Sequence, residues 1–337
     1  MPGTRAKPAL AVRRPRRPST ADGERVDAGG NEARPRVTTS ECIDRVAACV
    51  LAVSVIIPAR NCAGTLGTQL AALAQQRFAG PWELIIVDNG CTDATSAVAR
   101  AWVDRFPVPL VIARSAVRGV NRARNAGSSI AGGEILAFCD GDDEVTPGWL
   151  AALVEAIGQA DLVGGPLDED ALNPRTRRAR RPPFPPGRLP RALDHEDFVP
   201  GANLAIRASV LRAVGGFDEA FVLGQDDVDL SWRVRYNGFD VAFAAEATVA
   251  YRHRNGAAGL FAQFVRYGRA EPLLYRRHRR SGLRRAPTGA ILRRWAGLVR
   301  RIPRAIIDPA ARGAWIVTAA FSIGRIIGSV EHRARFL

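Results

Sequence analysis

The chain contains a single lysine, Lys7, although lysine and arginine together number 48 and the formal net charge is +15. Nearly all of the positive charge is therefore arginine, which a genome-wide codon bias explains as well as a function does. A basic excess of this size is typical of proteins that meet an anionic partner, whether nucleic acid, anionic lipid or a phosphorylated substrate. The charge thus predicts an anionic partner without selecting one.

Cysteines are few, and none of them form a C-x-x-C pair. An odd number without that spacing argues against a disulfide framework and against a zinc site, and it fits a reducing cytoplasm. The five cysteines are Cys42, Cys49, Cys62, Cys91 and Cys139.

Long hydrophobic runs are also missing. We find no clean apolar run of the roughly 18 to 20 residues that a membrane-spanning helix needs. The apolar segment 46–57 follows a basic leader, but it starts far from Met1 and leads directly into a strand-like motif. We therefore do not expect it to be a signal peptide.

The composition changes along the chain and suggests three regions. Residues 1–45 are rich in Arg, Pro, Gly and Thr and are expected to be a disordered basic tail. Residues 46–257 are expected to form one domain, interrupted at 168–191 by a mobile loop rich in proline and arginine. Helical spacing of apolar residues predicts a helical extension over 258–337.

Strands and helices alternate in the first half of the expected domain. Apolar, partly β-branched runs predict strands at 53–58, 84–87, 110–113 and 135–139, with helices at 65–76, 92–106, 122–131 and 149–157. This alternation predicts an α/β fold with a mixed, mostly parallel sheet flanked by helices. Ligands of such sheets bind beyond the carboxyl ends of the strands, where Arg60, Asp88 and Asp140 would lie.

Three carboxylates follow the strand that ends at Cys139. Asp140, Asp142 and Asp143 place like charges close together, and these repel unless a cation lies between them. Hard oxygen ligands suit Mg²⁺ or Mn²⁺. The alternative is a solvated acidic turn.

Seven motifs occur in a fixed order and carry a resemblance. They are Val53-Ser-Val-Ile-Ile-Pro-Ala-Arg-Asn61, Ile85-Ile-Val-Asp-Asn-Gly-Cys-Thr-Asp-Ala-Thr95, Ala123-Arg-Asn-Ala-Gly127, Phe138-Cys-Asp-Gly-Asp-Asp143, Gly201-Ala-Asn203, Gly215-Gly-Phe-Asp-Glu219 and Asp226-Asp-Val-Asp-Leu-Ser-Trp-Arg233. The series resembles the family 2 glycosyltransferases over residues 53–255. The resemblance implies the Rossmann-like GT-A fold and an inverting transfer from a nucleotide-diphosphate sugar.

The resemblance also implies site residues. Asp140 and Asp142 are expected to hold Mg²⁺ or Mn²⁺, with His253 as a further ligand, although a lone histidine is more often structural. Arg124 either pairs with the diphosphate or holds its helix to the acidic loop. Residues expected to bind the nucleotide sugar are Pro58, Arg60, Asn61, Asp88, Arg124, Asp140, Gly201, Asn203 and Asp226.

Inversion needs a carboxylate opposite the leaving group to take a proton from the acceptor hydroxyl. Asp227 matches the catalytic aspartate of the family by position. Asp226 stands where relatives carry glutamate, which keeps the charge and shortens one arm. We therefore expect Asp227 to be the catalytic base.

The C-terminal region leaves two interpretations open. The run 314–324 is apolar but short, and it is interrupted by Arg325. With Arg293, Arg294, Arg300 and Arg301 before it, the region would lie in a membrane interface or pack as a core helix with solvated arginines. The expected location is the cytoplasm, either free or peripheral at the inner face of the cell membrane.

Taken together, the sequence predicts a metal-dependent inverting glycosyltransferase. Its donor would be a UDP- or dTDP-type sugar, and its acceptor a hydroxyl of a polysaccharide, glycolipid or metabolite. One alternative is a catalytically inactive protein on the same fold, against which Asp140, Asp142 and Asp227 argue. A nucleic-acid-binding protein is disfavoured, because the chain lacks aromatic residues interleaved with basic ones and has no helix-turn-helix signature. We expect no nucleic-acid partner.

Overall fold

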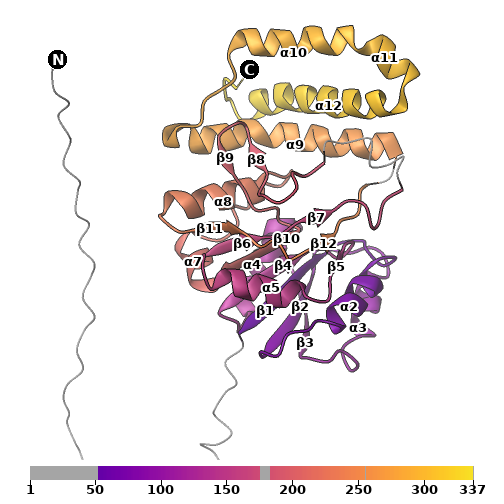
Figure 1. The fold of residues 1–337 in the computed structure, drawn as a ribbon, viewed down its shortest axis with the longest axis vertical. Helices are drawn as coiled ribbons and strands as arrows, with labels where there is room; N and C mark the ends of the chain where they lie inside the picture. Colours follow the sequence, from indigo (N-terminus) through magenta and orange to yellow (C-terminus); the bar gives the residue numbers. More distant parts are fainter. Residues whose placement is uncertain (1–51, 175–182, 255, 337) are drawn as a thin grey trace, which may run out of the picture. The chain divides into compact units, whose positions relative to one another are not determined.

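The computed structural model describes residues 52–174, 183–254 and 256–336. The predicted tail 1–45 and residues 175–182 of the predicted loop lie outside the described residues. The remaining residues form a central sheet with helices on both faces, followed by a group of C-terminal helices (Figure 1).

The central sheet is mostly parallel, which confirms the predicted fold class. Strand β10 runs antiparallel to both of its neighbours, β4 and β6, while β1, β2, β3 and β4 pair in parallel. The order across the sheet is β11 (Val241–Phe243), β6 (Leu162–Gly164), β10 (Asn203–Arg207), β4 (Ile135–Cys139), β1 (Val53–Ala59), β2 (Trp82–Asp88) and β3 (Leu110–Arg114). A smaller sheet consists of β5 (Glu144–Val145), β12 (Val249–Ala250) and β7 (Leu167–Asp168). A hairpin consists of β8 (Arg191–Ala192) and β9 (Glu196–Asp197).

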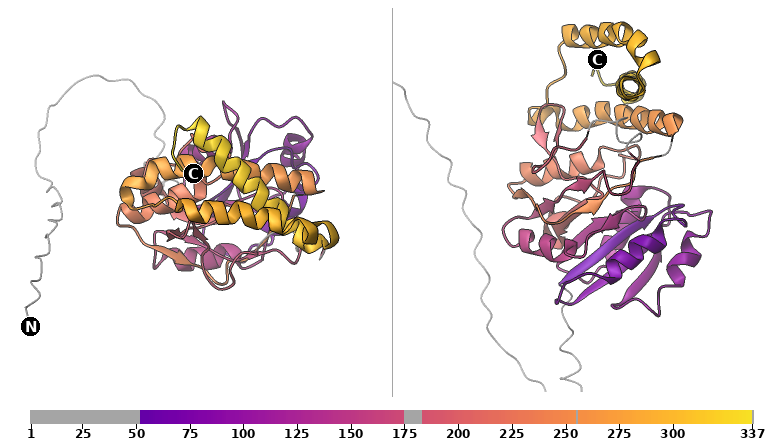
Figure 2. Two further views of the ribbon diagram at one scale, coloured as in Figure 1. Left: turned by 90° about the horizontal axis from the view of Figure 1, so that it is seen from above. Right: turned by 45° about the vertical axis from the view of Figure 1, so that its right-hand side comes forward.

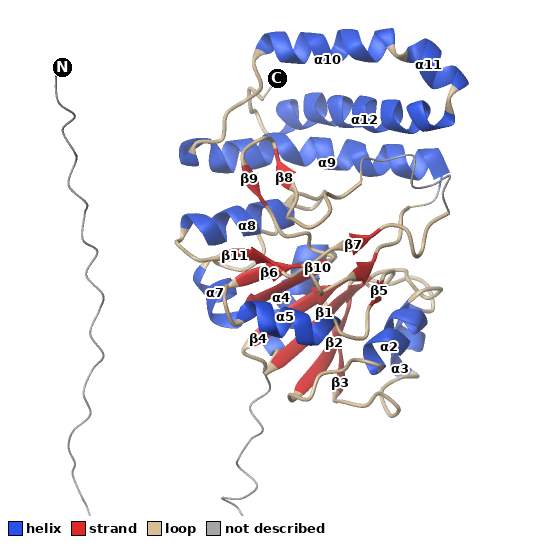
Figure 3. Cartoon of the chain, in the orientation of Figure 1, coloured by secondary structure: helices blue, strands red, loops and turns tan. Residues whose placement is uncertain are grey.

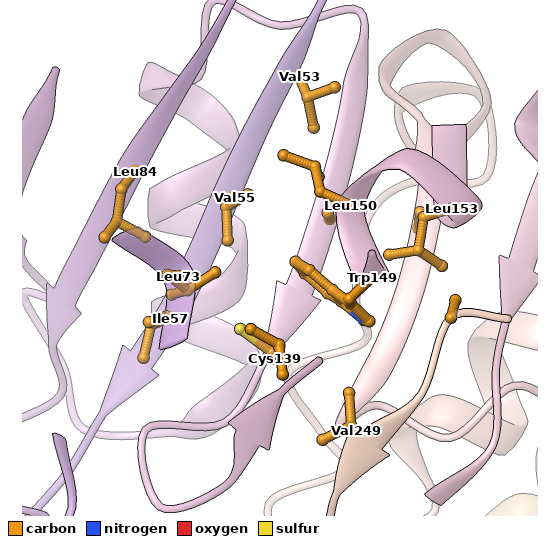
Figure 4. Packing of buried hydrophobic residues seen from close by; sticks show 14 of the residues in the cluster. Val53, Val55, Ile57, Leu73, Leu84, Cys139, Trp149, Leu150, Leu153 and Val249 are labelled. Carbon is orange, nitrogen blue, oxygen red and sulfur yellow. The ribbon is translucent and has the colours of Figure 1, made fainter. Parts of the chain in front are cut away.

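Both faces of the sheet are buried, as a parallel sheet requires. Val55 and Ile57 of β1 point into one apolar cluster, whereas Ile56 points into the other, because successive side chains alternate along a strand. Figure 4 shows the first cluster, in which Trp149 lies beneath β1 and β4. The sequence therefore reads as continuous apolar runs rather than as alternation.

The helices match the predictions closely, with one shorter than expected (Figure 3). The expected helix 92–106 is α3 (Thr95–Arg100), followed by turns with i→i−3 hydrogen bonds up to Arg105 and an i→i−4 bond at Phe106. Pro107 disfavours the helical conformation in Phe106, so the turns do not continue beyond it. The other helices of this part are α2 (Leu66–Ala74), α4 (Val120–Ile130), α5 (Trp149–Ile157), α7 (Ala208–Ala213) and α8 (Asp226–Tyr236).

The C-terminal residues form helices that lie beyond α8. They are α9 (Gly256–His278), the 3₁₀ turn η1 (Arg279–Ser281), α10 (Thr288–Arg300), α11 (Ile302–Ile307) and α12 (Pro309–Glu331). Helices α9 and α12 touch through Gly268 and Gly324, where a Cβ on Gly324 would lie 2.2 Å from the carbonyl oxygen of Val265. Glycine thus allows the two backbones to approach closely.

One helix of the described residues is long and apolar enough to cross a membrane. This segment, Ala311–Glu331, has a mean hydropathy of 1.4, and 39% of it is buried inside the protein. The segment contains Arg312 and Arg325, so it is not the clean apolar run that the sequence was found to lack. Length and composition are weak evidence, because a core helix meets the same criteria.

Candidate functional site

The loop after β4 holds its acidic residues through contacts from α2. The side chain of Gln69, which is fully buried, donates to the carbonyl oxygen of Asp140 at 3.1 Å and accepts from the backbone N–H of Val145 at 3.0 Å. Thr65 donates to the carbonyl oxygen of Gly141 at 3.2 Å. Both ends of the acidic loop are therefore fixed by the helix that follows β1.

Asp140, Asp142 and Asp143 form a tight cluster, and each offers a carboxylate oxygen within 4.8 Å of the others. Burial and the neighbouring carboxylates raise the pKa of Asp140 to about 6, against the opposing effect of Arg124. Burial, followed by Asp140 and Asp142, raises the pKa of Asp143 well above its usual range. The buried Oδ2 of Asp143 has no hydrogen-bond partner among the described residues. An unpartnered oxygen among crowded carboxylates fits a divalent cation.

Arg252 supports this cluster and was not foreseen from the sequence. Its backbone N–H donates to Oδ1 of Asp143 at 2.8 Å, and its Nε donates to the carbonyl oxygen of Asp142 at 2.8 Å. It also pairs with Glu144 at 3.1 Å. Arg252 directly precedes His253, and only the histidine was predicted to be a site residue.

Arg124 joins the acidic loop after β4 to the acidic start of α8. Its guanidinium lies 2.5 Å from Oδ2 of Asp226 and 3.8 Å from Oδ1 of Asp140, and its side chain is buried. Nη2 also donates to the carbonyl oxygen of Gly201 at 3.2 Å. A Cβ on Gly201 would lie 2.8 Å from Nη2, so a larger residue there would displace the guanidinium. Arg124 thus pairs mainly with Asp226 of α8 and, at longer range, with Asp140 of the acidic loop, and its predicted role toward the diphosphate stays a prediction.

Asp227 lies in the first turn of α8. Gln225, before it, adopts a left-handed conformation with φ of 67°, which turns the chain into the helix. Oδ2 of Asp227 accepts a hydrogen bond from the N–H of Gly201 at 3.1 Å. Burial and the neighbouring Asp226 raise the pKa of Asp227 to about 6. A carboxylate with a raised pKa is better matched to accepting a proton near neutral pH.

Three of the predicted nucleotide-sugar residues, Arg60, Asn61 and Asp88, lie at the ends of β1 and β2. Asp88 accepts hydrogen bonds from the N–H of Cys91 at 2.8 Å and from Ser96 at 2.9 Å. Burial opposes ionisation of Asp88, but these bonds outweigh it, so its pKa is lowered. Arg60 donates to the carbonyl oxygen of Asn89 at 3.2 Å, and Asn61 accepts from the N–H of Thr92 at 2.8 Å. Oδ1 of Asp88 therefore shapes the turn, and Oδ2 holds the first turn of α3.

Three further predicted residues are held by contacts within the fold. Pro58 is buried within β1. Asn203 is fully buried, accepting from Nε1 of Trp149 at 2.8 Å and donating to the carbonyl oxygen of Ala247 at 2.7 Å. Nε2 of His253 lies 2.7 Å from Oε1 of Glu169, and His253 is not part of the three-carboxylate cluster. Their predicted roles stay predictions, and their contacts here are structural.

A cavity of about 360 Å³ has none of the three clustered carboxylates among its lining residues. His253 lines it, and the residue before it, Arg252, holds Asp143. The remaining lining residues are Pro166, Leu167, Asp168, Glu169, Asp170 and Pro183 to Gly187. Arg124 and Gly201 thus connect the acidic cluster with Asp226 and Asp227, whereas the cavity lies at other residues.

Comparison with known proteins identifies related chains. Residues 54–215 match the family model described as glycosyl transferase family 2. A glycosyltransferase, AglE, from Haloferax volcanii is 31% identical over 195 residues, which cover 57% of this chain and 64% of the relative. A validoxylamine A glucosyltransferase from Streptomyces hygroscopicus is 28% identical and covers 66% of this chain and 61% of the relative. The chain thus spans about three fifths of the length of these curated relatives.

Among solved structures, a mannosyltransferase from Pyrobaculum calidifontis aligns with a TM-score of 0.61 at 18% sequence identity. The alignment covers 83% of this chain and 87% of that one, so the two share the GT-A fold. Residues 54–215 therefore resemble glycosyl transferase family 2, and the fold is the one that the mannosyltransferase shares.

Proposed function

We propose that the chain is a metal-dependent, inverting glycosyltransferase. It transfers a hexose from a nucleotide-diphosphate sugar, of UDP or dTDP type, to a hydroxyl group of an acceptor. The arrangement of Asp140, Arg124, Asp226 and Asp227 supports this proposal most directly, because one buried arginine ties the cation-binding cluster to the motif that carries the base.

Asp140 and Asp142 would hold Mg²⁺ or Mn²⁺, and the unpartnered oxygen of Asp143 makes it a third ligand candidate. When bound, such an ion supplies Lewis-acid stabilisation of the negative charge that develops on the departing nucleotide diphosphate. His253 would first have to exchange its contact with Glu169 before serving as a ligand. Arg252 keeps the loop in place through the backbone of Asp142.

The chemistry assigned to the protein is a proton transfer. Asp227 takes the proton of the acceptor hydroxyl. The oxygen of that hydroxyl attacks the anomeric carbon from the face opposite the nucleotide. The N–H of Gly201 holds Oδ2 of Asp227 at 3.1 Å, which orients the carboxylate. The new C–O bond forms as the bond to the diphosphate breaks, and this single displacement inverts the anomeric configuration.

The donor base and the acceptor are proposed only by class. Arg60, Asn61 and Asp88 form the turn beside which a nucleoside would bind. The mannosyltransferase with the same fold was solved with GDP-Man and Mn²⁺, which makes GDP a third nucleotide to test. Acceptors to test are polysaccharide, lipid-linked saccharide and metabolite hydroxyls. A relative from Rhizobium meliloti is named a succinoglycan biosynthesis protein, which favours a polysaccharide. We place the enzyme in the cytoplasm or at the inner face of the cell membrane.

The test is release of the nucleotide from each sugar nucleotide, measured with Mn²⁺ or with a chelator and with acceptors of the three classes. The proposal predicts release that needs both metal and acceptor, and a product whose anomeric configuration is opposite to that of the donor. Metal-independent transfer, or a product of retained configuration, would contradict it. An absence of transfer combined with intact nucleotide binding would favour the inactive protein of the same fold.

A further inference from the structure

Helices α10 and α11 present large apolar side chains to solvent. The exposed fractions are 65% for Leu292, 66% for Val299, 68% for Ile306 and 81% for Ile307. Leu292 and Val299 are seven residues apart, so they lie on the same face of α10. Scattered apolar residues are normal on a protein surface, but a stripe of four such highly exposed side chains on two successive helices indicates an interaction site.

Arginines border this stripe. Arg293 and Arg300 each follow one of the exposed apolar residues of α10, and Arg301 and Arg304 lie where α10 passes into α11. All four are exposed. Between residues 284 and 307 the sequence has seven arginines and no aspartate or glutamate. The face is therefore both apolar and strongly basic.

The exposed apolar residues of α10, Leu292 and Val299, are not needed to hold α10 on the protein. Leu298 is the one buried side chain described for α10, and its carbonyl oxygen accepts a hydrogen bond from Nε1 of Trp315 at 2.9 Å. Helices α10, α11 and α12 lie on the side of α9 away from the sheet (Figure 1), and Figure 2 views α10 and α12 from that side. The apolar stripe is thus directed away from the packed part of the helix.

We propose that α10 and α11 bind the surface of a bilayer that contains anionic lipids, with both helices lying in the plane of the interface. A basic amphipathic helix gains from burying its apolar stripe among acyl chains and from placing arginines near anionic headgroups. This inference rests on exposed residues outside the candidate active site and holds whether or not the transferase proposal does.

Two other occupants fit less well. A second copy of the chain would set seven arginines against seven arginines across a two-fold axis, which like-charge repulsion disfavours. A membrane-spanning α12 would have to leave α9, to which it is tied by the pair of Arg325 with Glu271 and by the close contact at Gly324. Peripheral binding needs neither change.

The test is cosedimentation of the full chain with vesicles of phosphatidylcholine, with and without phosphatidylglycerol. We expect binding to the anionic vesicles that weakens with salt, as electrostatic attraction requires. Leu292→Glu/Val299→Glu should reduce partitioning at least about tenfold through loss of apolar burial. Arg293→Glu/Arg300→Glu should reduce it by about fivefold or more for each arginine. All variants keep residues 1–51, so a difference reports α10.

Matched controls change the same residue types elsewhere on the surface. Val103→Glu/Ile130→Glu and Arg100→Glu/Arg212→Glu alter exposed positions outside the C-terminal helices and should bind vesicles like the wild type. Unchanged circular dichroism establishes that each variant folds.

Three outcomes overturn the proposal. The first is that the wild type does not bind anionic vesicles, or that the α10 variants bind as tightly as the controls. The second is a wild-type dimer that Leu292→Glu/Val299→Glu converts to monomer, which would make the face an interface between copies. The third is binding that survives both high salt and carbonate extraction, which would indicate a spanning α12.

Discussion

Arg124 is the residue on which the two acidic motifs depend. It is buried and neutralises Asp226 and, at longer range, Asp140. Removing one partner of a buried ion pair leaves an uncompensated charge, which is far more costly than loss of an exposed pair. Arg124 therefore contributes more to the stability of the fold than its place in a short sequence motif indicates.

Arg124→Ala should lower the free energy of unfolding by about 3–5 kcal/mol. Arg122→Ala is the matched control, because Arg122 is on the same helix and its pair with Glu219 is exposed on both sides. That control should cost at most about 1 kcal/mol. Urea denaturation of both variants measures the difference, and equal costs would refute the central role of Arg124.

The raised pKa of Asp227 predicts a pH dependence of transfer. Asp227 accepts a proton only when ionised, and burial and Asp226 raise its pKa to about 6. The rate should therefore be level above about pH 6 and fall about tenfold for each pH unit below it. The measurement is kcat/KM against pH at saturating Mn²⁺, so that the metal ligands stay ionised. A rate that stays constant well below that pH would contradict the assignment of the base.

The same shift has a consequence for stability. Because the pKa of Asp227 is higher in the folded than in the unfolded protein, its contribution to stability is present at low pH and is lost as pH rises through about 6. Asp227→Asn removes this ionisation. The variant should melt at a higher temperature than the wild type above that pH, with a smaller difference below it. Thermal melts across pH check this, and a variant less stable at all pH values would oppose it.

At the scale of elements, the junction of α9 with α12 depends on glycine. Gly324 faces the carbonyl oxygen of Val265 with no room for a Cβ, whereas nothing lies within 4 Å of a Cβ on Gly297 in α10. The two positions are both helical and differ in what surrounds them.

Alanine should therefore lower the stability of the protein at position 324 and raise it at position 297. Gly324→Ala should destabilise the protein, because the helix backbones must move apart. Gly297→Ala should stabilise it by up to about 1 kcal/mol, since alanine is the better helix former. Differential scanning calorimetry measures both, and stabilisation by Gly324→Ala would show that α12 does not pack on α9 as described.

Sequence patterns predicted the elements better than the contacts between them. Continuous apolar runs identified β1, β2, β3 and β4, since strands buried on both faces leave a clear signal. The cluster of Asp140, Asp142 and Asp143 was visible because its members are neighbours in the chain. The contacts of Arg124 with Asp226, and of Gln69 with the acidic loop, join residues far apart in sequence. No local pattern predicts such pairs, because they arise only when the chain has folded.

At the scale of the whole molecule, a chain with a net positive charge contains a locally acidic site. The formal net charge is +15, while Asp140, Asp142, Asp143, Asp226 and Asp227 gather at one edge of the sheet. Arg124 and Arg252 offset part of that negative charge. The described chain thus combines a site suited to a cation and a diphosphate with a basic surface at its C-terminal helices.

The central claim is that the acidic cluster binds a cation and a nucleotide together. Isothermal titration with UDP, dTDP and GDP, each with and without Mn²⁺, tests it most directly. We predict that one nucleotide binds only with Mn²⁺, that Asp142→Asn loses this binding and that Asp227→Asn keeps it. Binding that ignores the metal, or no binding of any of the three nucleotides under either condition, would contradict the account.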